Sequence, residues 1–186
     1  TLNGANTYSG TTLVNQGNLI LASGATLPNS TILTVSGSAT LDASASGLIL
    51  SAAASQKLAG NGTVLGDVTS GASTALTPGT SAGTLTLANN LTISGGTYTY
   101  DVSTNTAGRD LIVVNGNLTL TSGTLQVVAS GNLTNGLYRL IDYSGALTGG
   151  AANLVISGFS QAGKIATLED NIPNQIKQLL LSCRMP

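Results

Sequence analysis

Residues 116–127, GNLTLTSGTLQV, repeat the pattern of residues 89–100, NNLTISGGTYTY, and a related segment, GNLILASGATL, occupies residues 17–27. Each copy places an Asn-Leu pair before alternating aliphatic residues and ends the run with Ser-Gly or Gly-Gly. Alternation with a period of two is typical of β-strands that bury one face. The spacing between the second and third copies is a plausible length for one coil of a solenoid.

One such unit cannot bury its apolar face alone, but stacked coils bury these faces in a continuous column. We therefore predict an all-β fold, a right-handed parallel β-helix (β-solenoid) over residues 1–160. Coils of about 20 to 27 residues, stacked about 4.8 Å apart, would give roughly seven coils. Residues 161–186 differ, and we expect a hairpin-like closing segment there: a strand at 164–169, a turn at 170–175, and a strand or short helix at 176–182.

The repeated Asn and Gly residues are interpreted as structural. A coil corner needs a tight bend or a positive φ, which Gly supplies without a Cβ clash and Asn tolerates. The Asn residues precede their strands, so their amides are expected to stack as a ladder that bonds one coil to the next. The residues concerned are Asn18, Asn90 and Asn117 for the ladder, and Gly24, Gly95 and Gly123 for the corners.

Composition excludes several classes of protein. Charged residues make up 7% of the 186 residues, against about 25% in an ordinary domain, yet 41% are hydrophobic, so the chain is not of the disordered type. The net charge is −1 and no basic stripe occurs, which argues against nucleic-acid binding. No run of about 18 apolar residues is present, so we expect no membrane insertion by this segment. The lone Cys183 cannot close an internal disulfide; it is either a terminal residue of little consequence or a point of intermolecular attachment.

Catalytic chemistry is poorly supported by the residue types. Histidine is absent, which removes a Ser-His-Asp triad, Cys-His catalysis and His-based zinc sites. Few carboxylates remain for the pairs that act in glycoside hydrolysis, and alignment of the copies places Asp101 at the position of Val128, so no ladder of acids follows there. The most site-like dipeptide is Arg109-Asp110, which we interpret as a salt bridge at a coil corner. We therefore predict no catalytic residue, no metal site and no cofactor.

Two tyrosines and four threonines allow other surface functions. Tyr98 and Tyr100 alternate in TYTY, so they share one face of a strand. They form either an aromatic platform for the sugar rings of a glycan or part of the core. Thr-x-Thr pairs could in principle match an ice lattice, but those at 84/86 and 97/99 are too few for a regular array.

The opening sequence, GANTYSGTTLVNQGNLILASGATL, resembles the autotransporter-associated β-strand repeat. The resemblance covers residues 4–27 and 58–93 most specifically, and YRLIDYSGALTG at 138–149 is similar to C-terminal regions of the same proteins. It implies a parallel β-helix passenger on a bacterial surface and brings no catalytic residues. The residues that match the repeat are Gly4, Asn6, Thr7, Tyr8, Ser9, Gly10, Thr11, Thr12, Val14, Gly17, Leu19 and Leu21.

These observations favour a non-enzymatic structural protein, secreted or held on the outer cell surface of a bacterium. Such a segment would form a rod or fibre scaffold, and its end faces would allow homo-oligomers or filaments by end-to-end stacking. The alternative is an adhesin-type module that binds glycans or host surfaces. A polysaccharide-active enzyme is the third hypothesis, which the missing histidine disfavours.

Overall fold

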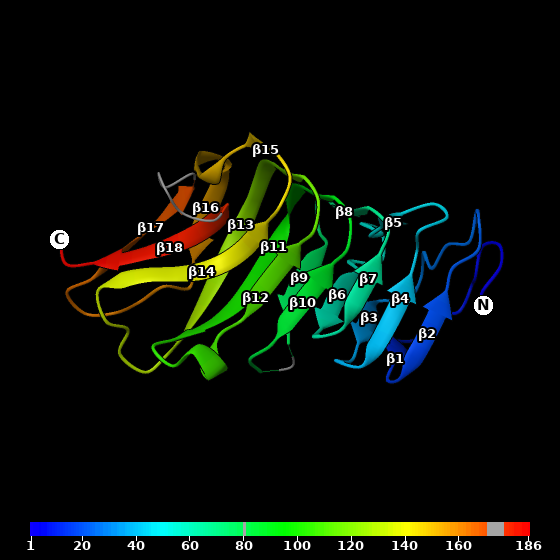
Figure 1. Ribbon diagram of the computed structural model, residues 1–186, viewed down its shortest axis with the longest axis horizontal. Helices are drawn as coiled ribbons and strands as arrows, with labels where there is room; N and C mark the ends of the chain where they lie inside the picture. Colours follow the sequence, from blue (N-terminus) through cyan, green and yellow to red (C-terminus); the bar gives the residue numbers. More distant parts are fainter. Residues whose placement is uncertain (80, 171–176) are drawn as a thin grey trace.

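The chain forms a β-solenoid of about 5 turns in which 55% of the residues are strand. The computed structural model describes residues 1–79, 81–170 and 177–186. Successive coils run from β1 and β2 at one end of the rod to β14–β18 at the other (Figure 1). Among the described residues, no helix is long and apolar enough to cross a membrane.

Two sheets make up the walls of the solenoid. The ten-stranded sheet contains β1 (Thr12–Val14), β3 (Ile32–Val35), β5 (Leu48–Ile49), β6 (Lys57–Gly60), β8 (Val68–Ser70), β9 (Ala75–Pro78), β11 (Leu91–Ser103), β13 (Leu118–Ser130), β15 (Leu147–Gly149) and β16 (Leu154–Ser157). The eight-stranded sheet contains β2 (Gly17–Ile20), β4 (Ala39–Asp42), β7 (Thr63–Leu65), β10 (Thr84–Leu87), β12 (Leu111–Val114), β14 (Gly136–Tyr143), β17 (Ile165–Asp170) and β18 (Gln178–Arg184). Two 3-10 turns, η1 (Thr106–Gly108) and η2 (Ala151–Asn153), lie in connections.

The core is a set of ladders in which each coil contributes one inward side chain. In the ten-stranded sheet, register stacks Leu33, Leu58, Leu76, Tyr98, Leu125 and Ile156. In the eight-stranded sheet, it stacks Leu19, Leu41, Val64, Leu87, Val114 and Tyr143. Most of these side chains are fully buried, so the alternating aliphatic residues of the sequence form the continuous column that was predicted.

The coils vary in length more than the sequence suggested. A short coil joins the partners Leu58 and Leu76, whereas a much longer one joins Leu125 to Ile156. The expected seven coils are therefore wrong: the solenoid has about 5 turns, because the later coils are long and the chain leaves the coil after β16. The repeat itself is confirmed, since Leu91 of the second copy pairs with Leu118 of the third.

The C-terminal segment closes the eight-stranded sheet with a hairpin. β17 and β18 are antiparallel to each other, and β18 is antiparallel to β14. The region expected to be a strand or short helix is thus a strand, while the expected turn at 170–175 falls mainly on 171–176, outside the described residues. Cys183 lies in β18 and is only 1% exposed, so an intermolecular disulfide or attachment point at this thiol is incompatible with the folded hairpin.

Glycine corners fall where the chain must bend. Gly24, with a φ of 76°, lies in a turn, while Gly95 and Gly123 lie inside the long strands β11 and β13. The β11–β13 register shifts between Ile93 and Thr97. At that shift Gly95 adopts a φ of 136°, which residues with a Cβ rarely adopt. One long strand can therefore follow two faces of the solenoid.

Replacing Gly95 with alanine should destabilise the fold. A Cβ there would lie 2.8 Å from the backbone nitrogen of Ala72, in addition to the unfavourable φ. We expect Gly95→Ala to lower the free energy of unfolding by about 2 kcal/mol, measured by urea denaturation. Gly10→Ala is the matched control, because a Cβ at Gly10 has nothing within 4 Å. Equal stability of the two variants would contradict this role of Gly95.

Candidate functional site

Asparagine and aspartate side chains tie successive coils together at one corner. Asp67 Oδ1 accepts hydrogen bonds from the backbone N–H of Asn90 at 3.2 Å and from its Nδ2 at 3.0 Å. Asn90 Oδ1 accepts from the backbone N–H of Asn117, and Asn117 Oδ1 accepts from that of Ala146, each at 2.8 Å. The ladder expected for Asn90 and Asn117 therefore exists, but it runs through backbone N–H groups.

Asn18 does not belong to this ladder. It lies in β2 of the eight-stranded sheet and pairs with Thr40, whereas Asn90 and Asn117 precede strands of the ten-stranded sheet. The prediction for Asn18 is wrong because the Asn-Leu motif marks the start of a strand without specifying which wall the strand joins.

The tyrosine pair is part of the core and is not a glycan platform. Tyr98 and Tyr100 share a face of β11 as predicted, but that face points inward, and the side chains are 1% and 0% exposed. The Tyr98 hydroxyl donates to the carbonyl of Gly95 and lies within hydrogen-bond distance of Ser70 Oγ. The Tyr100 hydroxyl is buried and makes no hydrogen bond within the described residues. The Thr-x-Thr pairs lie in β10 and β11, in different sheets, so they do not form one array.

Asp110 holds another corner together from inside. Its carboxylate accepts the backbone N–H of Gly83, in the preceding coil, at 2.9 Å and that of Asp101 at 2.8 Å. The residue is 2% exposed. Burial raises the pKa of Asp110 to about 7, although the two N–H donors act against this rise, and the charge of Asp101 adds to it. The result is a buried carboxyl that changes charge near neutral pH.

Arg109 does not form the salt bridge that was predicted with Asp110. Its guanidinium donates to the carbonyl oxygens of Ser103 and Thr104 and lies 4.9 Å from the ring centre of Tyr138. The two side chains therefore bond to different backbone groups of this corner. Among the described residues, Arg139 instead forms an ion pair with Asp142.

A second arginine joins this corner from the next coil. Thr84 pairs with Leu111, and Ile112 pairs with Ile141, so the starts of β10 and β12 lie in one column with the middle of β14. They enclose a hollow of about 180 Å³ lined by Thr84, Arg109, Asp110, Leu111 and Arg139. Sequence reasoning missed Arg139, because only the register between coils shows that it lies near Asp110. A second hollow of about 320 Å³ along the outer face includes Asp101, Asp110 and Lys57.

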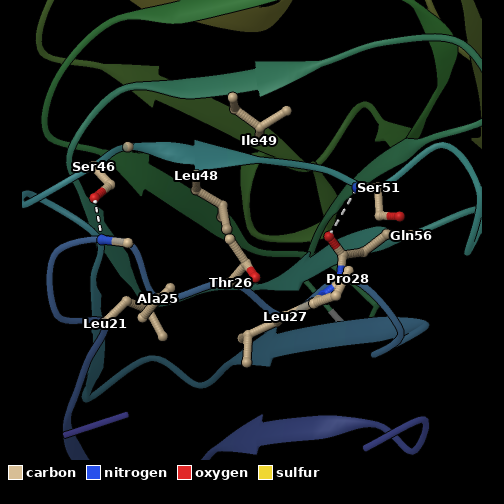
Figure 2. Close-up of a pocket in the computed structure, with 12 residues that line it drawn as sticks. Leu21, Ala25, Thr26, Leu27, Pro28, Ser46, Leu48, Ile49, Ser51 and Gln56 are labelled. Atoms are coloured by element: carbon tan, nitrogen blue, oxygen red, sulfur yellow. Dashed lines mark hydrogen bonds between the residues drawn. The ribbon is translucent and has the colours of Figure 1, made fainter. Parts of the chain in front are cut away.

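An apolar hollow of about 350 Å³ opens between the first two coils (Figure 2). The coils are joined at its ends by Gly24 N–H to Ser46 Oγ and by Gln56 Nε2 to the carbonyl of Leu27. Figure 2 shows Leu48 extending from β5 toward Thr26, while Ile49 points to the opposite side. No charged residue lines this hollow, so it offers an aliphatic surface and no group for acid–base chemistry.

Comparison with protein-family models and with curated protein sequences finds no match for this chain. No group of three or more His, Cys, Asp or Glu side chains suited to a metal ion occurs within the described ranges. The corner around Asp110 is the candidate functional site, because it combines a hollow, two guanidinium groups and a carboxyl with a shifted pKa.

The raised pKa of Asp110 predicts a stability that falls as pH rises. The folded state holds the proton up to about pH 7, whereas the unfolded chain releases it near pH 4. The resulting stabilisation is complete below about pH 4 and is lost as pH rises through 7. We expect the free energy of unfolding to drop by on the order of 1–3 kcal/mol between pH 5 and pH 8.

Urea denaturation across that pH range tests this expectation. Hydrogen bonds from the Ser44 hydroxyl and backbone N–H lower the pKa of Asp42, so Asp42 titrates below the range. The pKa values of Tyr98, Tyr100 and Tyr143 are raised above 10. Asp110→Asn should therefore flatten the profile; a wild-type profile that rises with pH would refute the assignment.

Proposed function

We propose that this chain is a non-enzymatic structural segment of a secreted or cell-surface bacterial protein, and that it associates end to end into a rod or fibre. The stacked coils of the fold support this proposal, since strand edges remain at both ends of such a rod. The resemblance to the autotransporter-associated repeat supports the bacterial surface as its location. The burial of Tyr98 and Tyr100 removes one surface that the alternative adhesin function could have used, the aromatic platform for glycans.

The matching direction of the terminal strands is the observation that carries this proposal. β17 is antiparallel to β18, and β18 is antiparallel to β14. β17 therefore runs in the same direction as β14 and as β2 at the opposite end of the sheet. The ten-stranded sheet is parallel from β1 to β15 and β16. A second copy stacked head to tail would thus meet parallel edges in both sheets.

The first coil lacks the charges that usually protect exposed strand edges. Residues 1–41 contain no Lys, Arg, Asp or Glu. Leu13, in the edge strand β1, is 63% exposed. Because Val14 accepts a hydrogen bond from Ser36 in the neighbouring coil, and successive residues of a strand bond to opposite sides, the N–H and C=O of Leu13 face the open edge. This edge is available to another strand.

A charge at the open edge should prevent association. We expect the wild-type chain to sediment as concentration-dependent, elongated oligomers, and Leu13→Lys to require roughly tenfold more protein for the same degree of association. Sedimentation velocity and negative-stain electron microscopy measure both. Ile49→Lys is the matched control, because Ile49 is 76% exposed on the side of the rod. This variant should associate as the wild-type chain does. A wild-type chain that stays monomeric throughout the micromolar range would contradict the proposal.

A further inference from the structure

The hollow beside Asp110 concentrates positive charge in a molecule that has little. The chain contains six basic residues, and two of them, Arg109 and Arg139, line this one hollow. They come from different coils, since Arg109 precedes β12 and Arg139 lies in β14, and the two strands are paired. Thr84 adds a hydroxyl from a third coil, through the pairing of β10 with β12.

Arg109 is held in place before any ligand arrives. Two backbone carbonyls and the ring of Tyr138 fix its guanidinium. A guanidinium has five N–H donors, so these two hydrogen bonds leave donors with no partner among the described residues. A planar fork with free donors suits the paired oxygens of a carboxylate or sulfate. Because the side chain is already ordered, binding costs less conformational entropy than it would for a free arginine.

Arg139 completes the cationic side of the hollow. Its side chain is 50% exposed and pairs with Asp142, which is 14% exposed. The bonds to Asp142 come from Nε and one terminal nitrogen, so the other terminal nitrogen has no partner within the described parts of the chain. Asp142 neutralises part of the charge but does not line the hollow.

We propose that Arg109, Arg139 and Thr84 form a binding site for one oxyanion group, a carboxylate or a sulfate, of the kind that acidic saccharides carry. The hollow of about 180 Å³ has room for the charged group, while the rest of such a ligand would lie along the outer surface. The site is independent of end-to-end association, because its lining residues come from the middle and later coils of one chain.

Asp110 makes this site sensitive to pH. It lines the same hollow, and its pKa of about 7 means that its carboxyl is neutral in mild acid and can then donate a hydrogen bond to the anion. Above pH 7 its negative charge opposes the anion, together with Asp101 and Asp142, while Arg109 and Arg139 favour it. The buried Tyr100 hydroxyl next to Asp110 stays neutral, since its pKa is raised well above 10. Affinity should therefore fall as pH rises from 5.5 to 8.

Titration of the full chain with sodium glucuronate and with sodium sulfate, followed by NMR or calorimetry at pH 5.5, tests the site. We expect saturable binding of at least one of the two anions and no binding of glucose, a neutral sugar. Arg139→Gln should weaken the affinity roughly tenfold, as loss of one charged contact does. Arg184→Gln removes the same charge from an exposed position at the end of β18 and should leave the affinity unchanged.

Each outcome separates the site from general charge attraction. Binding of glucuronate alone identifies a carboxylate site, and binding of sulfate alone identifies a sulfate site; both support the proposal. An equal loss in Arg139→Gln and Arg184→Gln, or no saturable binding of either anion, would overturn it. Arg139 is half exposed, so Arg139→Gln should fold, and an unchanged thermal midpoint verifies this. An affinity that does not change between pH 5.5 and pH 8 would refute the part assigned to Asp110.

Discussion

The structure depends on the hydrogen bonds that each coil makes to the coils before and after it. Strands of both walls pair with strands about one coil away in sequence, so the backbone ladder runs along the rod. This arrangement forces inward side chains into columns, and it explains why Leu, Val, Ile and Tyr occupy matching positions. A change in the volume of one inward side chain therefore affects the packing of its neighbours in the coils before and after it, which lie one strand spacing away.

The strands of the walls pair continuously, so the backbone groups that lack strand partners lie at the corners. There the backbone turns and its N–H groups lose strand partners, which must be replaced when the corner is buried. The Asp67–Asn90–Asn117 ladder does this at one corner with side chains that also bond the coils together. Asp110 does the same at another corner with its carboxyl group. It is the only acidic or basic residue among the buried residues of the described chain. The order of this corner and its sensitivity to pH thus have one cause: an ionisable side chain accepts the hydrogen bonds of the backbone N–H groups in a buried turn.

The sequence predicted the walls better than the corners. Alternation of aliphatic residues and the repeated Asn-Leu segment correctly paired Leu91 with Leu118 and Asp101 with Val128, because strand registers follow from local periodicity. It could not decide which face of β11 points inward, so Tyr98 remained open between surface and core until its partners Leu76 and Leu125 were known. Asn18 failed for a related reason, since the same short motif begins strands in both walls.

The candidate site could not be predicted from the sequence, because its assembly depends on the lengths of the coils. Arg109 and Arg139 come from successive coils, and coils in this chain differ widely in length, as the pairs Leu58–Leu76 and Leu125–Ile156 show, so no fixed repeat predicts that the two arginines meet. The register of β12 with β14 brings them together. The chain has only six basic residues, so two guanidinium groups in one hollow are a large share of its positive charge, although Asp142 neutralises part of it. A low overall charge therefore makes a small cationic hollow more distinctive, because the surrounding surface of hydroxyl and amide groups competes weakly for an anion.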